Sequence, residues 1–224
     1  KEIFNAPADT IQLRQENAIL QSEVASLQSQ VVGLQQQVAD TQRLEALLNF
    51  ARTQRQNKYL AAQVIFRDPR AFMNFLIIDR GTDDGIRRGM PVVSAEGLVG
   101  RIDWVTSNAA RVQLIIDSTS LVGVVIEPSK VDADLVGSVT SNLSIENIPQ
   151  SASVQIGDLI LTSGLGGKYP ADIMIGQVAS IRDQATDLFK VASVQPVVDF
   201  DKLQIVLVIQ NFSPIDVTPL LPEG

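Results

Sequence analysis

The chain has 224 residues, of which 45% are hydrophobic, and its mean hydropathy is +0.15. Such a composition can bury a core, which excludes a wholly disordered protein. The chain contains no Cys and no His. Disulfide frameworks, thiol catalysis and zinc–thiolate sites are thereby excluded, and the usual general base is missing. We therefore expect no enzyme activity, no metal and no cofactor.

Charge further limits the classes of partner. The formal net charge is −7, and nearly all of it lies after residue 57. An acidic body without a basic cluster argues against nucleic acid or an anionic lipid surface as the main partner. No apolar run approaches the roughly 18–20 residues that a membrane-spanning helix needs. Because the sequence does not begin with Met, we expect a further N-terminal segment in the natural protein.

Residues 1–57 carry a heptad pattern with Val at a and Leu at d. This pattern predicts a helix from about Thr10 to Gln56, capped by Asp9-Thr10, that pairs as a parallel two-stranded coiled coil. Asn17 lies at an a position, where a buried amide fixes the register. A helix packed on its own domain is the alternative, but its apolar stripe is usually wider. The predicted interface comprises Leu13, Asn17, Leu20, Val24, Leu27, Val31, Leu34 and Val38.

After Asn57 the chain becomes rich in Val, Ile, Thr and Gly, with short apolar runs separated by turn signals. This pattern predicts a mainly β body of small barrels. We expect a first barrel over 58–117, a second over 118–202 and a Pro-rich extended tail over 213–224, a candidate docking peptide. A strand near 203–212 is a candidate to complete the first barrel. The expected strands are 61–66, 72–79, 90–94, 98–104, 111–116, 121–127, 133–140, 158–162, 174–182, 192–198 and 203–210.

One glycine-rich segment, Ser163-Gly164-Leu165-Gly166-Gly167, invites comparison with the serine loop of trypsin-like proteases, which are also double β-barrels. That reaction needs a base hydrogen-bonded to the serine. Lys130 or Lys168 could replace the missing His in a Ser–Lys pair, but their spacing does not indicate one. We therefore predict a glycine-rich turn here.

Acidic clusters are the remaining candidates for chemistry. The segment 79–85 has three acids and two glycines, but it lacks the ligand spacing of a calcium loop. The pairs Asp132 with Asp134 and Asp199 with Asp201 could in principle serve two-carboxylate hydrolysis. Nothing else in the sequence supports this, so solvated surface positions are the favoured interpretation.

An ordered set of turn motifs follows the heptad helix, and together they resemble the MreC family of rod shape-determining proteins over essentially the whole chain. Ala171 stands where the family pattern would have Gly. The motifs are Val64–Pro69, Ile78–Gly81, Gly85–Val92, Gly97–Gly100, Gly157–Gly164, Gly166–Pro170 and Ile175-Gly176. The residues predicted to set their turns are Gly85, Gly89, Pro91, Gly97, Gly100, Gly157, Gly164, Gly166, Gly167, Pro170 and Gly176.

The resemblance implies a coiled coil followed by two β-barrels like those of chymotrypsin, without catalytic residues. It implies a periplasmic scaffold of lateral cell-wall synthesis, anchored in the inner membrane by an upstream helix outside this chain. The implied partners are a second copy in dimers or filaments, the elongation-specific penicillin-binding transpeptidase, MreD, RodA and, indirectly, MreB. We expect exposed strand edges or inter-domain grooves to serve as the assembly surfaces.

Two other functions remain open from the sequence. A periplasmic adaptor of an export complex also joins coiled coil to β domains, but it uses a helical hairpin, and only one helical stretch is predicted here. A degenerate Ser–Lys hydrolase at Ser163 is the second alternative.

Overall fold

The computed structural model describes residues 6–53, 57–67, 74–182 and 188–215. The chain divides into two compact units, residues 1–48 and 49–224. The first consists of most of the helix, and the second contains the two barrels. The end of the motif Val64–Pro69, from Asp68 on, and the tail beyond Ile215 lie outside the described residues.

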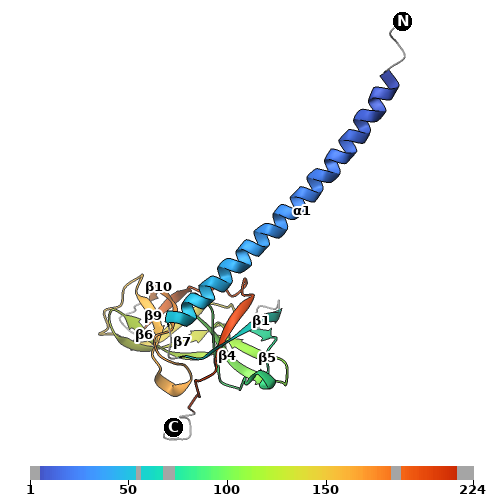
Figure 1. The fold of residues 1–224 in the computed structure, drawn as a ribbon. Coiled ribbons are helices and arrows are strands. Elements are labelled where there is room, and N and C mark those ends of the chain that lie inside the picture. The colour runs from blue at the N-terminus through green and yellow to red at the C-terminus, as the bar shows by residue number, and fades with distance from the viewer. Residues whose placement is uncertain (1–5, 54–56, 68–73, 183–187, 216–224) are drawn as a thin grey trace. The chain divides into compact units, whose positions relative to one another are not determined.

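The helix α1 runs from Ala6 to Thr53 without interruption (Figure 1). Its 48 residues would extend for roughly 72 Å at 1.5 Å per residue. The predicted cap at Asp9-Thr10 is wrong, because the helix begins earlier and places both residues inside it. Pro7 falls in the first turn, where its missing N–H costs no hydrogen bond. The helical hairpin of an export adaptor is not found among the described residues, which hold this one α-helix.

The first barrel is a closed sheet of six antiparallel strands in the order β1-β12-β3-β4-β5-β2. Its closing strand comes from near the end of the chain, since β12 pairs with β1 from Tyr59↔Ile209 to Gln63↔Ile205 and also pairs with β3. A short 3₁₀ turn, η1 (Thr82–Asp84), connects β2 to β3. The strands are β1 (Tyr59–Arg67), β2 (Phe75–Ile78), β3 (Pro91–Val93), β4 (Leu98–Val105), β5 (Ala110–Leu114) and β12 (Ile205–Ile209).

The second barrel is also closed, in the order β10-β11-β8-β7-β6-β9. The 3₁₀ turn η2 (Leu165–Gly167) lies between β9 and β10. The prediction of a mainly β protein with one long helix and two small barrels is therefore confirmed. The strands are β6 (Leu121–Glu127), β7 (Val131–Gly137), β8 (Leu143–Pro149), β9 (Leu159–Thr162), β10 (Met174–Arg182) and β11 (Phe189–Pro196).

The described residues contain twelve strands, one more than predicted, and the missing one is β8. Its alternation breaks at Asn147, which has a positive φ of 61°. The register against β11 shifts at this point, since Lys190 pairs with Ile148 but Ala192 pairs with Ile145. A bulge of this kind inserts an extra residue and conceals the period-2 pattern from a reading of the sequence.

Closure of both sheets contradicts the expectation of exposed strand edges. In the part of the chain that the structure describes, each strand has a neighbour on both sides. A closed barrel satisfies its backbone groups internally and leaves no edge to which a neighbouring chain could add a strand. Surfaces for assembly must therefore come from side chains.

Candidate interaction surfaces

The heptad residues of α1 form a stripe of half-exposed apolar side chains. The seven Leu and Val side chains of the predicted interface are each between 51% and 65% exposed, and Asn17 is exposed as well. Val24, Leu27, Gln28, Val31 and Val32 line a shallow depression on this stripe. Apolar surface is costly to leave in water at about 25 cal/mol per Å². The stripe is therefore a surface that gains stability from a partner.

The polar side chains in the barrel interiors have structural roles. Ser94, Ser120 and Thr162 are the buried polar residues among those described. The Thr162 hydroxyl donates to the Pro170 carbonyl oxygen at 2.6 Å and accepts from the Ile173 N–H at 2.9 Å. The Ser94 hydroxyl accepts from the Glu96 N–H at 3.2 Å. These hydroxyls stabilise turns, as buried polar groups must find partners.

The glycine-rich segment is built as a turn. The Ser163 hydroxyl oxygen accepts a hydrogen bond from the Leu165 N–H at 3.1 Å, the local bond of a serine turn. Gly164, Gly166 and Gly167 all have positive φ. Lys130, one candidate base, forms an ion pair with Glu127. The geometry gives no support to a Ser–Lys hydrolase.

The other turn residues of the sequence prediction fall in two structural settings. Gly85, Gly89 and Gly157 also adopt positive φ, outside the strands. Gly97 immediately precedes β4, Pro91 begins β3, and Pro170 lies in the β9–β10 connection. Two glycines lie within strands, where a Cβ would approach a neighbouring carbonyl oxygen within 2.3 Å: Gly100 on β4 and Gly176 on β10.

The two barrels are joined by close backbone contact. A Cβ on Gly97 would lie 2.3 Å from the Met174 carbonyl oxygen and 3.0 Å from a methyl of Val197, both on the second barrel. The Asn74 side chain adds polar links, because it donates to the Ile116 carbonyl oxygen at 3.2 Å and accepts from the Ser141 hydroxyl at 3.0 Å. The barrels therefore meet at a fitted seam without room for a ligand at Gly97.

The first residues of the tail reach from one barrel to the other. The Ile215 N–H donates to the Gly167 carbonyl oxygen at 2.9 Å. A Cβ on Gly89 would lie 2.5 Å from the Pro214 ring, so the tail passes closely over the first barrel. This segment reinforces the seam.

Tyr169 is buried where the barrels meet, with 4% of its surface exposed. Burial raises its pKa to about 12, against smaller opposing effects of the Arg101 charge on the first barrel and of the hydrogen bond with Ser120. The neutral phenol is therefore favoured in the folded protein. Sequence reasoning did not select this residue.

We expect alkaline pH to destabilise the fold through Tyr169. Its stabilising contribution is fully present below pH 10, where the unfolded phenol ionises, and is lost as pH rises towards 12. The difference between a pKa of 10 and one of about 12 corresponds to roughly 3 kcal/mol of stability. Urea titrations at pH 8 to 11.5 should show this loss, and Tyr169→Phe should remove most of it. An equal alkaline loss of stability in the wild type and in Tyr169→Phe would contradict the assignment. Tyr59→Phe is the matched control: burial also raises the pKa of Tyr59, but Tyr59 is only partly buried, so its replacement should remove less of the loss.

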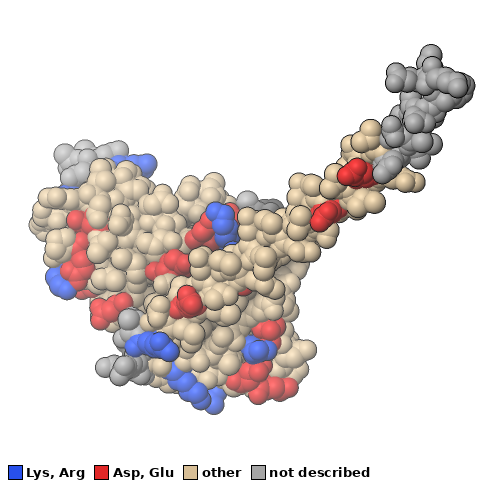
Figure 2. All heavy atoms as spheres, turned by 45° about the horizontal axis from the view of Figure 1, so that its top comes forward, with Lys and Arg blue, Asp and Glu red and all other residues tan. Residues whose placement is uncertain are grey.

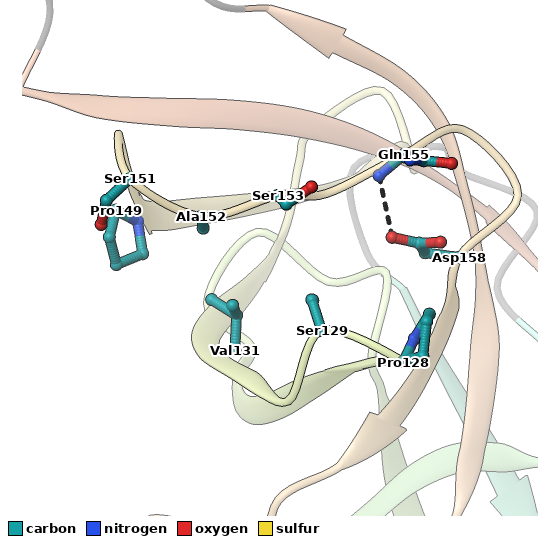
Figure 3. Close-up of a pocket in the computed structure, with 9 residues that line it drawn as sticks. All are labelled: Pro128, Ser129, Val131, Pro149, Ser151, Ala152, Ser153, Gln155 and Asp158. Carbon is teal, nitrogen blue, oxygen red and sulfur yellow. Dashed lines mark hydrogen bonds between the residues drawn. The ribbon is translucent and has the colours of Figure 1, made fainter.

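A hollow of about 600 Å³ lies on the second barrel (Figure 3). Its one carboxylate, Asp158, accepts a hydrogen bond from the Gln155 N–H at 2.8 Å, shown as a dashed line. The Asp158 carboxylate therefore stabilises the turn between Gln155 and Asp158. The lining is Pro128, Ser129, Val131, Pro149, Ser151, Ala152, Ser153, Gln155 and Asp158.

Charges on the barrels are mixed in sign. Figure 2 shows red and blue side chains interspersed on the face drawn. Ion pairs join Arg111 to Asp103 at 2.6 Å and Lys202 to Asp199 at 2.7 Å. The described residues contain no cluster of three or more potential metal ligands and no helix long and apolar enough to cross a bilayer.

Sequence reasoning also missed an exposed group on the outside of the first barrel. Phe66, Phe75 and Trp104 lie there with Arg111. The available signal was weak, because Phe66, Phe75 and Trp104 lie apart in the sequence and belong to three different strands. Their alignment became visible only with the strand register.

The sequence and fold of this chain are similar to those of known proteins. Residues 64–210 match the family described as rod shape-determining protein MreC, barrel core. The cell shape-determining protein MreC of Haemophilus influenzae is 30% identical over 219 residues, covering 96% of this chain. The chain spans 62% of that relative's length.

Solved structures agree with this result. A crystal structure of MreC from Pseudomonas aeruginosa has a TM-score of 0.66 at 30% identity and covers 68% of this chain and 99% of its own. A complex between penicillin-binding protein PBP2 and MreC from Helicobacter pylori has a TM-score of 0.57 at 19% identity, covers 69% of this chain and 98% of its own, and shares the fold. With the family match extending over both barrels, the chain belongs to the MreC family of rod shape-determining proteins.

Proposed function

We propose that this chain is a non-enzymatic scaffold of cell-wall elongation, which pairs through α1 and presents its barrel pair to wall-synthesis proteins. The observation that carries the proposal is the seven-residue apolar repeat, whose side chains are all more than half exposed. A helix of this pattern is stabilised by pairing with a second helix. The barrels supply rigid surfaces and no reactive pair among the described residues.

Pairing along α1 is expected to be parallel and of moderate strength. Val at a with Leu at d favours two strands, and Asn17 at an a position favours one register. The repeat weakens beyond Val38, where Thr41 takes a d position and Glu45 an a position. The segment from Leu13 to Val38 would therefore provide most of the dimer's stability.

The proposed partner is the elongation-specific penicillin-binding transpeptidase. The Helicobacter pylori MreC that shares this fold forms a complex with PBP2, and this supports the assignment. We further propose a periplasmic location with an upstream membrane anchor, and assembly with MreD, RodA and, indirectly, MreB. Paired helices would present two transpeptidase sites at a set spacing.

Avidity for immobilised transpeptidase tests this proposal. The wild-type chain should bind a surface carrying the soluble transpeptidase about 10–100-fold more tightly than the seam variant Leu20→Asp/Leu27→Asp, because two linked sites bind together. Ile19→Asp, at a position 64% exposed but outside the a and d positions, is the control and should bind like wild type. The same concentration series in free solution should give equal affinities for all three. Failure of the wild type to bind the transpeptidase would contradict the proposed partner.

A further inference from the structure

The outer face of the first barrel carries three aromatic side chains and one arginine close together across its strands. Strand register places Phe66 of β1 opposite Ile77 of β2, Ile77 opposite Arg111 of β5, and Arg111 opposite Trp104 of β4. Directly opposed residues share a face of a sheet. Phe75 lies two residues before Ile77 and joins the same face. We call Phe66, Phe75, Arg111 and Trp104 the aromatic row.

Two β-bulges direct these residues outward. The register shifts between Val64 and Phe66 and again between Ile102 and Trp104. Each bulge inserts a residue and re-aims the side chains beside it. As a result Ile65 is 57%, Phe66 46% and Trp104 64% exposed. The intervening inward positions of β2 and β5, such as Leu76 and Val112, are fully buried.

The aromatic row is held rigid in advance of any contact. The Phe66 and Phe75 rings stack at 6.1 Å with an interplanar angle of 25°. The guanidinium of Arg111 lies 5.6 Å from the centre of the Phe75 ring. Its Nε and Nη2 donate to the Asp103 carboxylate at 2.9 and 2.6 Å. Pre-ordered side chains lose little entropy on binding, and Trp and Arg are enriched among energetically dominant interface residues.

We propose that the aromatic row is a contact surface for the aromatic row of a second copy of this chain, arranged by a two-fold axis. The argument is charge complementarity. A surface that carries one cation and one anion side by side is complementary to itself, since a two-fold rotation places Arg111 over the partner's Asp103 and Trp104. The chain as a whole has a net charge of −7, so two copies meet at least cost where the local charge is balanced.

This inference rests on the proposed function, because the row would join dimers that α1 has already formed. The row is short, and contacts of this size are weak on their own. One two-fold contact makes a dimer, and a second, different one joins dimers into larger assemblies. The row thus supplies the lateral contact that a scaffold needs once strand edges are closed.

Trp104 is the only tryptophan of the chain, so its fluorescence reports on the row directly. With increasing concentration of the full chain, the emission should shift to the blue as assemblies larger than the dimer form. Acrylamide quenching should fall about two-fold, as expected for a hot-spot side chain that loses contact with water. Phe66→Asp should prevent both changes but leave the dimer. Leu121→Asp, on β6 and likewise 46% exposed, is the matched control and should behave like wild type.

Charge-reversal variants test whether the partner of the aromatic row is a second copy of this chain. Asp103→Arg and Arg111→Asp should each stop at the dimer, because two like charges then oppose each other. A mixture of the two variants should assemble, since the surfaces are again complementary. Near-ultraviolet circular dichroism of each variant checks that the barrel is folded.

The proposal is overturned if Trp104 stays fully quenchable in assemblies of the wild type, or if the single reversals assemble as well as the mixture. Protection of Trp104 only after addition of the soluble transpeptidase would also overturn it and would assign the row to that partner. Failure of the proposed scaffold function gives a different result: the wild type would form no α1 dimer or would not bind the transpeptidase. Failure of the row proposal leaves the dimer and transpeptidase binding intact and removes only the protection of Trp104 and the effect of the charge reversals.

Discussion

Replacing Leu20 and Leu27 by Asp should dissociate the proposed α1-paired dimer into monomers. Both are d residues, 53% exposed in the single helix, and each chain of a dimer loses two. Burying a Leu side chain contributes about 1.5–3 kcal/mol, and a carboxylate in the seam adds repulsion against its twin. Four lost contacts of this size correspond to a dissociation constant raised by at least about a thousandfold. Sedimentation equilibrium between roughly 1 and 100 μM covers this change, the range in which weak dimers dissociate.

The control places the same charges elsewhere on the helix. Ile19 and Val32 are 64% and 61% exposed and lie outside the a and d positions. Ile19→Asp/Val32→Asp should change helix propensity by a similar amount and leave the dimer intact. An unchanged mass in the Leu20/Leu27 variant, or equal dissociation in both variants, would show that α1 pairs by some other surface.

Gly97→Val will weaken the seam between the barrels and destabilise the whole second unit. The new Cβ would lie 2.3 Å from the Met174 carbonyl oxygen, a backbone atom that cannot turn aside as a side chain would. Overpacking of a fitted contact typically costs about 1–3 kcal/mol, and a backbone clash lies at the upper end. Urea unfolding followed by circular dichroism should show a midpoint lowered accordingly.

Gly33 provides the matched control, because a Cβ there would meet nothing within 4 Å. Gly33→Ala should leave barrel unfolding unchanged and favour the helix by about 1 kcal/mol. Gly97 lies outside the left-handed region, so its need for glycine is steric. Wild-type stability in Gly97→Val would mean that the barrels separate without cost, and the seam would then be no fixed joint.

Several contacts join the two barrels to each other. Gly97 packs against Met174, Asn74 bridges to Ser141, and Ile215 bonds to Gly167. The residues that make these contacts lie far apart along the chain. Such joints favour binding by a scaffold, because a surface that is already ordered loses less conformational entropy when a partner binds.

Local patterns were sufficient for the elements that repeat regularly. A seven-residue period of Leu and Val predicted the helix, since a period of that kind keeps one stripe on one face. Pairing along the stripe stays a prediction. Short Val- and Ile-rich runs between glycines predicted barrels, and the fold class was confirmed. The absence of His and Cys from the sequence was sufficient to exclude thiol catalysis, zinc–thiolate sites and a histidine general base.

The misses share a physical cause. The strand β8 was overlooked because Asn147 forms a bulge that interrupts its alternation. The N-cap was misplaced because Pro7 is equally suited to a first helical turn. A strand near 203–212 was a candidate for the first barrel, but the sequence did not indicate that it pairs with both β1 and β3 and so leaves no strand edge free.

The order of residues along the chain by itself determined the helix, its apolar repeat and the abundance of short strands, because these follow from neighbours a few positions apart. Tertiary structure alone decided that both sheets close without a free edge, why Gly97 must be glycine, and that Phe66, Phe75, Arg111 and Trp104 stand in one row. Those properties depend on register between distant segments. Register is set by the packing of a whole core and by bulges within it, which no local window contains.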